Sequence, residues 1–214
     1  MSQAPELPAT TLANKCYSTM FSECVSLEKA PELPATVIAF HCYYSMFYNC
    51  KQLKEAPKLP AENIYDGCYS SMFEKCSSLV VLPDLPATEI ADNCYSSMFK
   101  DCALAETAPA LPAMSLARAC YDHMFSGCSS LSSPIVLPAE NLEYKCYNSM
   151  FQGCSNLNYI EVGVMTLDNQ KNATDRWVEG IDGEGLFVFP CGRKDDKKGG
   201  SQGPTKLTTV SSPL

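Results

Sequence analysis

Apolar residues recur every four positions along most of the chain, and the whole pattern is repeated at a constant interval. In the first copy one apolar row is Leu12, Cys16, Met20 and Cys24, and a second row, one position further on, is Ala13, Tyr17 and Phe21. Rows at this spacing cover one broad side of an α-helix and leave polar residues on the other side. The pattern predicts helices over residues 11–23, 37–49, 63–75, 89–101, 115–127 and 141–153.

Each predicted helix is followed by a short apolar segment that contains a proline. The first of these segments is 27–33, Leu-Glu-Lys-Ala-Pro-Glu-Leu. Proline cannot donate to a sheet ladder, so Pro31 and its equivalents limit each predicted strand to two or three paired residues. The sixth copy lacks this proline, and its residues 157–162 predict a more regular alternating strand.

The repeat is uniform enough to predict the architecture. The motif Cys-Tyr-x-x-Met-Phe-x-x-Cys begins at Cys16, Cys42, Cys68, Cys94, Cys120 and Cys146, and the same difference separates every neighbouring pair (42 − 16 = 26). One helix and one short strand per copy is the plan of a leucine-rich repeat. We therefore expect an α/β solenoid of the leucine-rich-repeat type over residues 1–164, with six helix-plus-short-strand repeats.

The two ends of the predicted solenoid differ. Residues 165–191 predict a C-terminal cap with a helix over 172–181 and a strand over 185–190, in which Trp177 lies on the last repeat. Residues 192–214 have no periodicity and few large apolar side chains, which predicts a disordered tail or linker. The N-terminal end has no comparable cap, so we expect either a longer array or a partner there, including self-association through this end.

The repeat also resembles a known family. The pattern Met-Phe-x-x-Cys-x-x-Leu-x-x-Ala-Pro-x-Leu-Pro is similar to the BspA-type leucine-rich repeat of bacterial surface proteins, through Phe21, Cys24, Leu27, Pro34 and their equivalents over residues 4–164. The resemblance implies a cell-surface or secreted protein that contacts host proteins, matrix or other cells. The first residues of the chain show neither a basic nor an apolar region typical of a signal peptide.

Twelve of the thirteen cysteines occupy repeat positions, and Cys191 is left over. Within a copy, Cys16 and Cys24 would be about 12 Å apart along a helix, beyond the roughly 7 Å between Cα atoms that a disulfide spans. Helices of neighbouring copies would be about 8–10 Å apart, which again disfavours disulfides. The wide separation of the two cysteines in each copy does not suit zinc either. A packing ladder of small apolar thiols is therefore favoured over disulfides and over a metal site.

The charge, the apolar runs and the motifs of the sequence argue against several classes of function. The net charge is −8, which disfavours nucleic-acid binding, because that binding depends on neutralising phosphates. No apolar run approaches the length of about 18 residues that would insert into a membrane. The sequence has no glycine-rich phosphate loop, nucleophile elbow or distinct carboxylate pair, so we predict a non-enzymatic protein without a cofactor.

The predicted function is a binding or adhesion module whose protein or glycan ligand lies on the concave strand face. Two columns of solvent-facing strand residues vary in charge and size, whereas the core columns hardly vary. The first column is Lys29, Glu55, Val81, Thr107, Ser133 and Tyr159, and its neighbour is Glu28, Lys54, Val80, Glu106, Ser132 and Asn158. The alternative is a structural spacer or assembly unit, as in a surface layer or a phage fibre, that associates through its uncapped N-terminal end.

Overall fold

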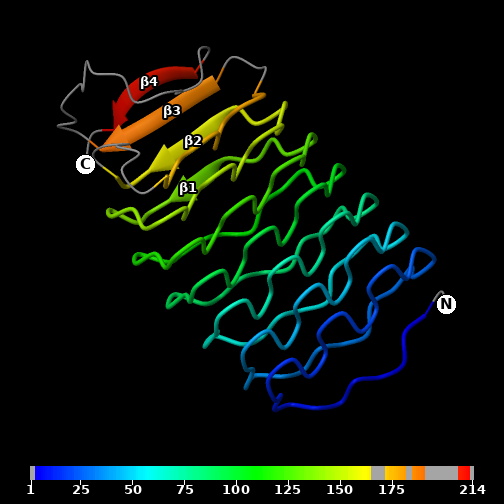
Figure 1. Cartoon of the computed structure of the whole chain (residues 1–214). Helices are drawn as coiled ribbons and strands as arrows, with labels where there is room; N and C mark the ends of the chain where they lie inside the picture. Colours follow the sequence, from blue (N-terminus) through cyan, green and yellow to red (C-terminus); the bar gives the residue numbers. More distant parts are fainter. Residues whose placement is uncertain (1–2, 165–171, 182–184, 191–206, 213–214) are drawn as a thin grey trace.

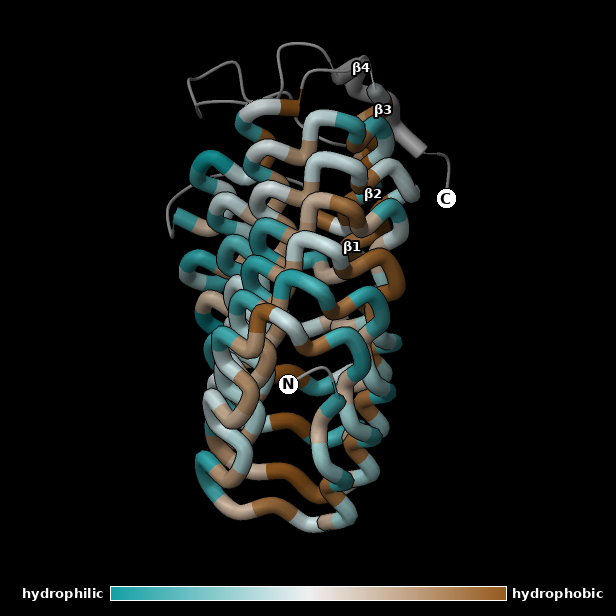
Figure 2. Tube along the Cα trace, turned by 90° about the vertical axis from the view of Figure 1, so that its right-hand side faces the viewer, coloured by the Kyte–Doolittle hydropathy of each residue, from teal (hydrophilic) through white to brown (hydrophobic). Residues whose placement is uncertain are grey.

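The computed structural model shows a stack of rungs, one for each copy of the repeat, which lie side by side from the N-terminal to the C-terminal end (Figure 1). It describes residues 3–164, 172–181, 185–190 and 207–212, the last of these by its backbone alone. Each rung consists of a turn segment, such as residues 13–24, and an extended segment, such as residues 27–38. Seen edge-on, the rungs form a flattened tube (Figure 2).

The expected α/β solenoid with leucine-rich repeats is wrong, because the described residues contain no helix. Each predicted helix is instead a chain of turns, in which every fourth residue has a positive φ. In the third copy these residues are Gly67 (φ 58°), Ser71 (φ 52°) and Lys75 (φ 64°). A right-handed helix cannot contain such residues. The same part of the chain therefore holds no helix that could cross a membrane.

Backbone hydrogen bonds explain why turns replace the helix. Along residues 15–24 the N–H groups alternate between two kinds of acceptor. The N–H of Cys16 donates to the carbonyl of Ala13 (3.2 Å), which closes a turn, and the N–H of Tyr17 donates to Cys42 of the next rung (2.9 Å). Because Cys, Tyr, Ser and Phe dominate these segments and are weak helix formers, pairing between identical rungs prevails over bonding within a helix.

Strands form only near the C-terminal end of the described chain, contrary to the expected strand in every repeat. The strands β1 (Ile135–Leu137), β2 (Tyr159–Val162), β3 (Gly185–Pro190) and β4 (Leu207–Ser212) make one parallel sheet in that order. Earlier rungs show single bridges such as Glu55–Val81. One repeat position is proline in the first four copies, at Pro31, Pro57, Pro83 and Pro109. The same position is Ile135 in β1 and Glu161 in β2, so the ladder forms where this proline is missing.

The segment predicted as a capping helix is a seventh rung. Residues 172–181 form turns with positive φ at Asn172, Arg176 and Gly180, each one position later than the repeat interval alone would place it (172 − 145 = 27). The N–H of Phe151 donates to the carbonyl of Trp177 (2.7 Å), as in the other rungs. The strand predicted over 185–190 is β3, and Leu207–Ser212, within the expected tail, pairs with it as β4. The rest of that tail lies outside the described residues.

The core is built from stacked columns of identical side chains. Rings of Tyr17, Tyr43, Tyr69, Tyr95, Tyr121 and Tyr147 stack with centroids 5.6–6.0 Å apart, and the equivalent phenylalanines stack at 5.5–5.9 Å. Trp177 is 2% exposed and lies on both columns, 6.3 Å from Tyr147 and 6.4 Å from Phe151, as predicted for a residue that covers the last repeat. Phe187 of β3 packs edge-on against its other side at 5.2 Å.

Candidate binding surfaces

The residues predicted to bind a ligand lie where each turn segment passes into its extended segment. We call them the edge columns: Lys29, Glu55, Val81, Thr107, Ser133 and Tyr159, with Glu28, Lys54, Val80, Glu106, Ser132 and Asn158. Backbone contacts align them from rung to rung, since the N–H groups of Val80 and Val81 donate to the carbonyl of Lys54 (2.9 and 3.3 Å). All are exposed except Ser133 and Tyr159, which are half-buried.

The structure brings neighbouring members of the edge columns together but not their ends. Rungs that are paired by backbone hydrogen bonds lie about 4.8 Å apart, so five steps from Glu28 to Asn158 span about 24 Å. The columns therefore make a line along the stack and not one pocket. Near its middle, Val80 and Val81 are 46% and 52% exposed, with Lys54 and Glu55 on one side and Glu106 on the other.

Among the described residues, grooves open along the extended segments. One of about 320 Å³ lies between residues 3–8 and the following rung, where Lys29, Pro31 and Pro34 line it. Another, of about 380 Å³, lies between Pro109–Pro112 and β1. Both are rich in proline, which lacks the N–H that would join neighbouring rungs. The regular proline columns were the sequence signal for these grooves, but the sequence analysis interpreted Pro31 and its equivalents only as limits of the strands.

An aromatic surface that the sequence analysis did not predict lies on the second and third rungs. We call Phe40, His41, Tyr44 and Tyr65 the aromatic patch. Phe40 and Tyr65 have ring centroids 5.4 Å apart, and those of His41 and Tyr44 are 5.9 Å apart. Phe40, Tyr44 and Tyr65 are 44%, 39% and 42% exposed. The signal was available in the sequence, because the column of Tyr44 holds Ser in three other copies and the column of Tyr65 holds Ala in four.

The repeat cysteines pack in the core as two columns of free thiols. The twelve repeat cysteines are free thiols, and ten are buried, while Cys16 is exposed and Cys24 is half-buried. The distance argument against disulfides fails, since neighbouring rungs lie much closer together than packed helices would. Hydrogen bonds hold five thiols of the second column: Cys50 Sγ donates to the carbonyl of Phe21 (3.1 Å), and the same bond recurs in four further rungs.

Burial makes these thiols poor nucleophiles and poor metal ligands. Desolvation raises the pKa of Cys42 and Cys146 to about 11 and that of Cys50 and Cys154 to about 12. Because the thiolate is the reactive and metal-binding species, the raised pKa keeps these side chains inert. Within the described ranges, no cluster of three or more His, Cys, Asp or Glu residues could hold a metal ion.

One polar network on the turn segments has the residue types of a catalytic site. Asp122 accepts from the Asn148 amide (2.7 Å) and pairs with Nδ1 of His123 (2.8 Å). Among the residues that the structure places, no hydroxyl or thiol is hydrogen-bonded to the His123 ring. The network orients side chains between two rungs and contains no nucleophile for the histidine to activate.

Comparisons with known proteins give no match: no family model, no curated protein and no solved structure is similar to this chain. The likeness to BspA-type repeats therefore stays a prediction from the sequence.

Proposed function

We propose that the chain is a non-enzymatic binding module that holds a partner protein along its edge columns. The observation that supports this proposal most is the exposed pair Val80 and Val81, which has charged residues on both sides along the same line. Protein interfaces commonly combine an apolar centre with a polar rim. The fixed spacing of the rungs presents these side chains on a rigid backbone, which lowers the entropy that binding costs.

The test compares substitutions of exposed valines at two places on the surface. The double variant Val80→Asp/Val81→Asp should lose binding to ligands found on an array of surface proteins and glycans. Val37→Asp is the matched control, because Val37 is 55% exposed but lies at the other end of its extended segment. Equal loss in both variants, or loss in neither, would contradict a ligand site on the edge columns.

We infer a location at the cell surface or outside the cell, as the resemblance of the repeat to the BspA-type pattern suggests. The ten buried thiols are compatible with an oxidising environment, because their raised pKa and burial suppress the thiolate that would react. Surface biotinylation of intact cells, followed by recovery of the labelled protein, tests the location. Labelling only after the cells are lysed would contradict it.

A second candidate function is assembly through the N-terminal end of the stack. Met20 is 46% exposed, whereas Met46, Met72, Met98, Met124 and Met150 are fully buried. In the described part of the chain, no backbone N–H of another rung donates to the carbonyls of the first turn segment, such as those of Cys16 and Ser18. This end therefore offers both apolar area and a row of acceptors, which a second copy would cover.

The oligomeric state tests the assembly. Light scattering over a range of protein concentrations should show association of the unaltered protein and its loss in Met20→Glu. Met114→Glu is the matched control, since Met114 is 60% exposed on another part of the surface. A monomer at all concentrations, or equal effects of the two variants, would contradict this function.

A further inference from the structure

The aromatic patch is not needed by the fold. At the position of Phe40 the first copy has Asn14, at that of Tyr44 three copies have serine, and at that of Tyr65 four copies have alanine. The rungs with these small or polar residues form the same turns and the same hydrogen bonds. Large exposed rings that the stack does not require suggest a separate role for this surface.

The backbone is adapted to one ring of the patch. Gly67 has a φ of 58°, and a Cβ built on it would lie 2.7 Å from Nε2 of His41. Any larger residue at position 67 would push the imidazole of His41 away from Tyr44. The glycine therefore lets His41 lie flat over the backbone, where its ring is tilted by 49° to that of Tyr44.

The electrostatic surroundings of the patch favour a cation. Asp66 is exposed and follows Tyr65 in the chain, and it occupies the position next to Phe40, because the N–H of His41 donates to the carbonyl of Asp66 (3.1 Å). Aromatic faces carry partial negative charge and attract ammonium and guanidinium groups. A carboxylate beside several ring faces adds to this attraction, and the net charge of −8 draws basic partners toward the whole molecule.

Another exposed ring on the turn segments, that of Tyr144, shows the same attraction within the chain. The Arg118 guanidinium lies 4.7 Å from the ring centroid of Tyr144. Lys75 contacts an aromatic residue differently, because its Nζ donates a hydrogen bond to the hydroxyl of Tyr48 (2.8 Å). Among the described residues, no lysine or arginine lies over Phe40, Tyr44 or Tyr65. The patch is therefore a surface of the same chemistry whose cation must come from outside.

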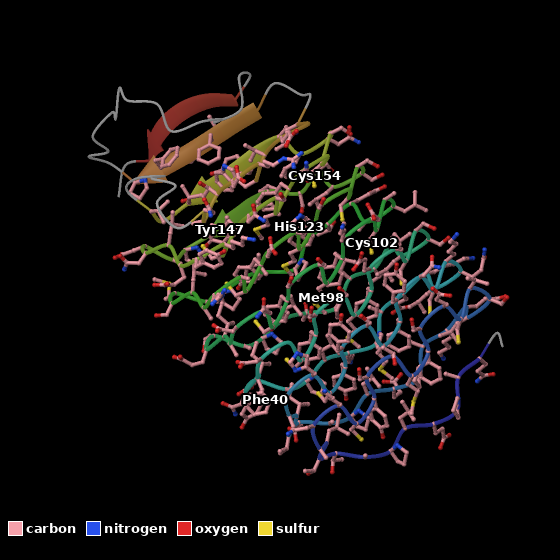
Figure 3. All side chains as sticks on the ribbon, viewed as in Figure 1. Phe40, Met98, Cys102, His123, Tyr147 and Cys154 are labelled. Atoms are coloured by element: carbon pink, nitrogen blue, oxygen red, sulfur yellow. The ribbon has the colours of Figure 1, made fainter. Side chains whose placement is uncertain are left out.

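We propose that the aromatic patch binds lysine and arginine side chains of a basic segment in a partner protein. The site is independent of the edge columns. Phe40 lies at the edge of the stack where the turn segments begin, while Cys102 and Cys154 lie toward the opposite edge, where the turn segments end and the edge columns follow (Figure 3). Failure of one proposal therefore leaves the other untouched.

The test uses a fluorescent peptide of alternating Arg and Gly, with its affinity measured by anisotropy. The variant Phe40→Asn/Tyr44→Ser/Tyr65→Ala keeps the net charge and uses residues that the same columns contain in other copies. It should bind about tenfold more weakly, since each of three ring contacts is lost. Asp66→Asn should also weaken binding, and higher salt should reduce the effect of Asp66.

Two controls make the result specific. Tyr144→Asn removes an exposed ring that already holds Arg118, and it should leave the affinity unchanged. A peptide of alternating Gln and Gly should not bind. Unchanged affinity in the triple variant, or equal binding of the neutral peptide, would overturn the proposal. Binding of a neutral oligosaccharide that the triple variant loses, without binding of the basic peptide, would overturn it too and assign the patch to sugars.

Discussion

At the scale of single residues, a repeated side chain makes the same contacts in successive rungs. Cys50, Cys76 and their equivalents fill core space and also donate to the carbonyl of a phenylalanine in the preceding rung. That carbonyl already accepts a turn hydrogen bond, as Phe21 does from the N–H of Cys24 (3.1 Å). Cysteine suits this place, because it is small enough for the core and carries a weak donor.

Loss of one such thiol should therefore be costly. Cys102→Ala removes a fully buried sulfur and its hydrogen bond to Phe73, and we expect a loss of about 1–2 kcal/mol in the free energy of unfolding. Cys16 belongs to the other cysteine column and is exposed, so Cys16→Ala should change the free energy of unfolding by less than about 0.5 kcal/mol. Denaturant unfolding measures both, and equal effects would mean that burial of the thiol does not stabilise the stack.

The tyrosine column contains one unsatisfied group. The Tyr69 hydroxyl is buried and has no hydrogen-bond partner among the described residues, which costs free energy. Tyr69→Phe keeps the stacked ring, so we expect it to raise the free energy of unfolding by about 1 kcal/mol. Tyr44→Phe, at an exposed hydroxyl, should leave stability unchanged. A lower melting temperature for Tyr69→Phe would show that the hydroxyl is satisfied in solution.

At the scale of elements, the turn segment depends on residues that tolerate positive φ. Such residues recur every four positions, and several are Gly or Asn, as at Gly67, Asn93 and Gly153. These types accept the left-handed region at little cost. Ala119 occupies the same column as Gly67 with a φ of 49° and has no comparable tolerance.

Exchanging the residues at these two sites should have opposite effects. Ala119→Gly relieves backbone strain, and we expect it to raise the free energy of unfolding by about 0.5–1 kcal/mol. Gly67→Ala adds strain and a contact with His41, and it should lower stability by at least about 1 kcal/mol. Thermal unfolding of both variants checks the pair. Destabilisation by Ala119→Gly would indicate that a helix or another turn geometry forms at this segment.

The sequence allowed the period, the buried columns and the role of Trp177 to be predicted, because these depend only on which residues are apolar. Phe47, Leu53 and their equivalents are fully buried as the pattern indicates. The sequence did not distinguish the turn segment from a helix, because pairs of apolar residues at every fourth position fit both structures. The aromatic patch was missed for a related reason: attention to what repeats hides Phe40 and Tyr65, which matter as exceptions to their columns.

At the scale of the whole molecule, identical columns concentrate many titratable groups in one core. Burial raises the pKa of the core thiols from 9.0, to about 11 in Cys42 and about 12 in Cys50, and it raises the pKa of Tyr69 well above 10.0. In the unfolded chain these groups lose their protons at lower pH. The folded state therefore binds more protons than the unfolded state above about pH 9, and stability falls as pH rises.

We therefore expect cooperative unfolding in alkali. The stabilisation is fully present below about pH 9, where the unfolded thiols are protonated, and it is lost as pH rises through 11–12. Denaturation midpoints measured from pH 7 to 11 should fall steeply above pH 9, and tyrosinate absorbance should appear together with unfolding. A constant midpoint up to pH 10.5, or gradual tyrosine ionisation before unfolding, would contradict burial of these columns.

The last prediction concerns how the stack loses its structure. Trp177 is the large side chain that closes both aromatic columns, and its truncation to alanine should cost about 3–5 kcal/mol. Because each rung contacts only its neighbours, this loss should open the C-terminal rungs first. Hydrogen exchange on Trp177→Ala should show lost protection over residues 141–164, while the central rungs stay protected. Uniform loss along the whole chain would mean that the stack unfolds as one unit, and unchanged protection would mean that Phe187 and β3 close the columns without the tryptophan.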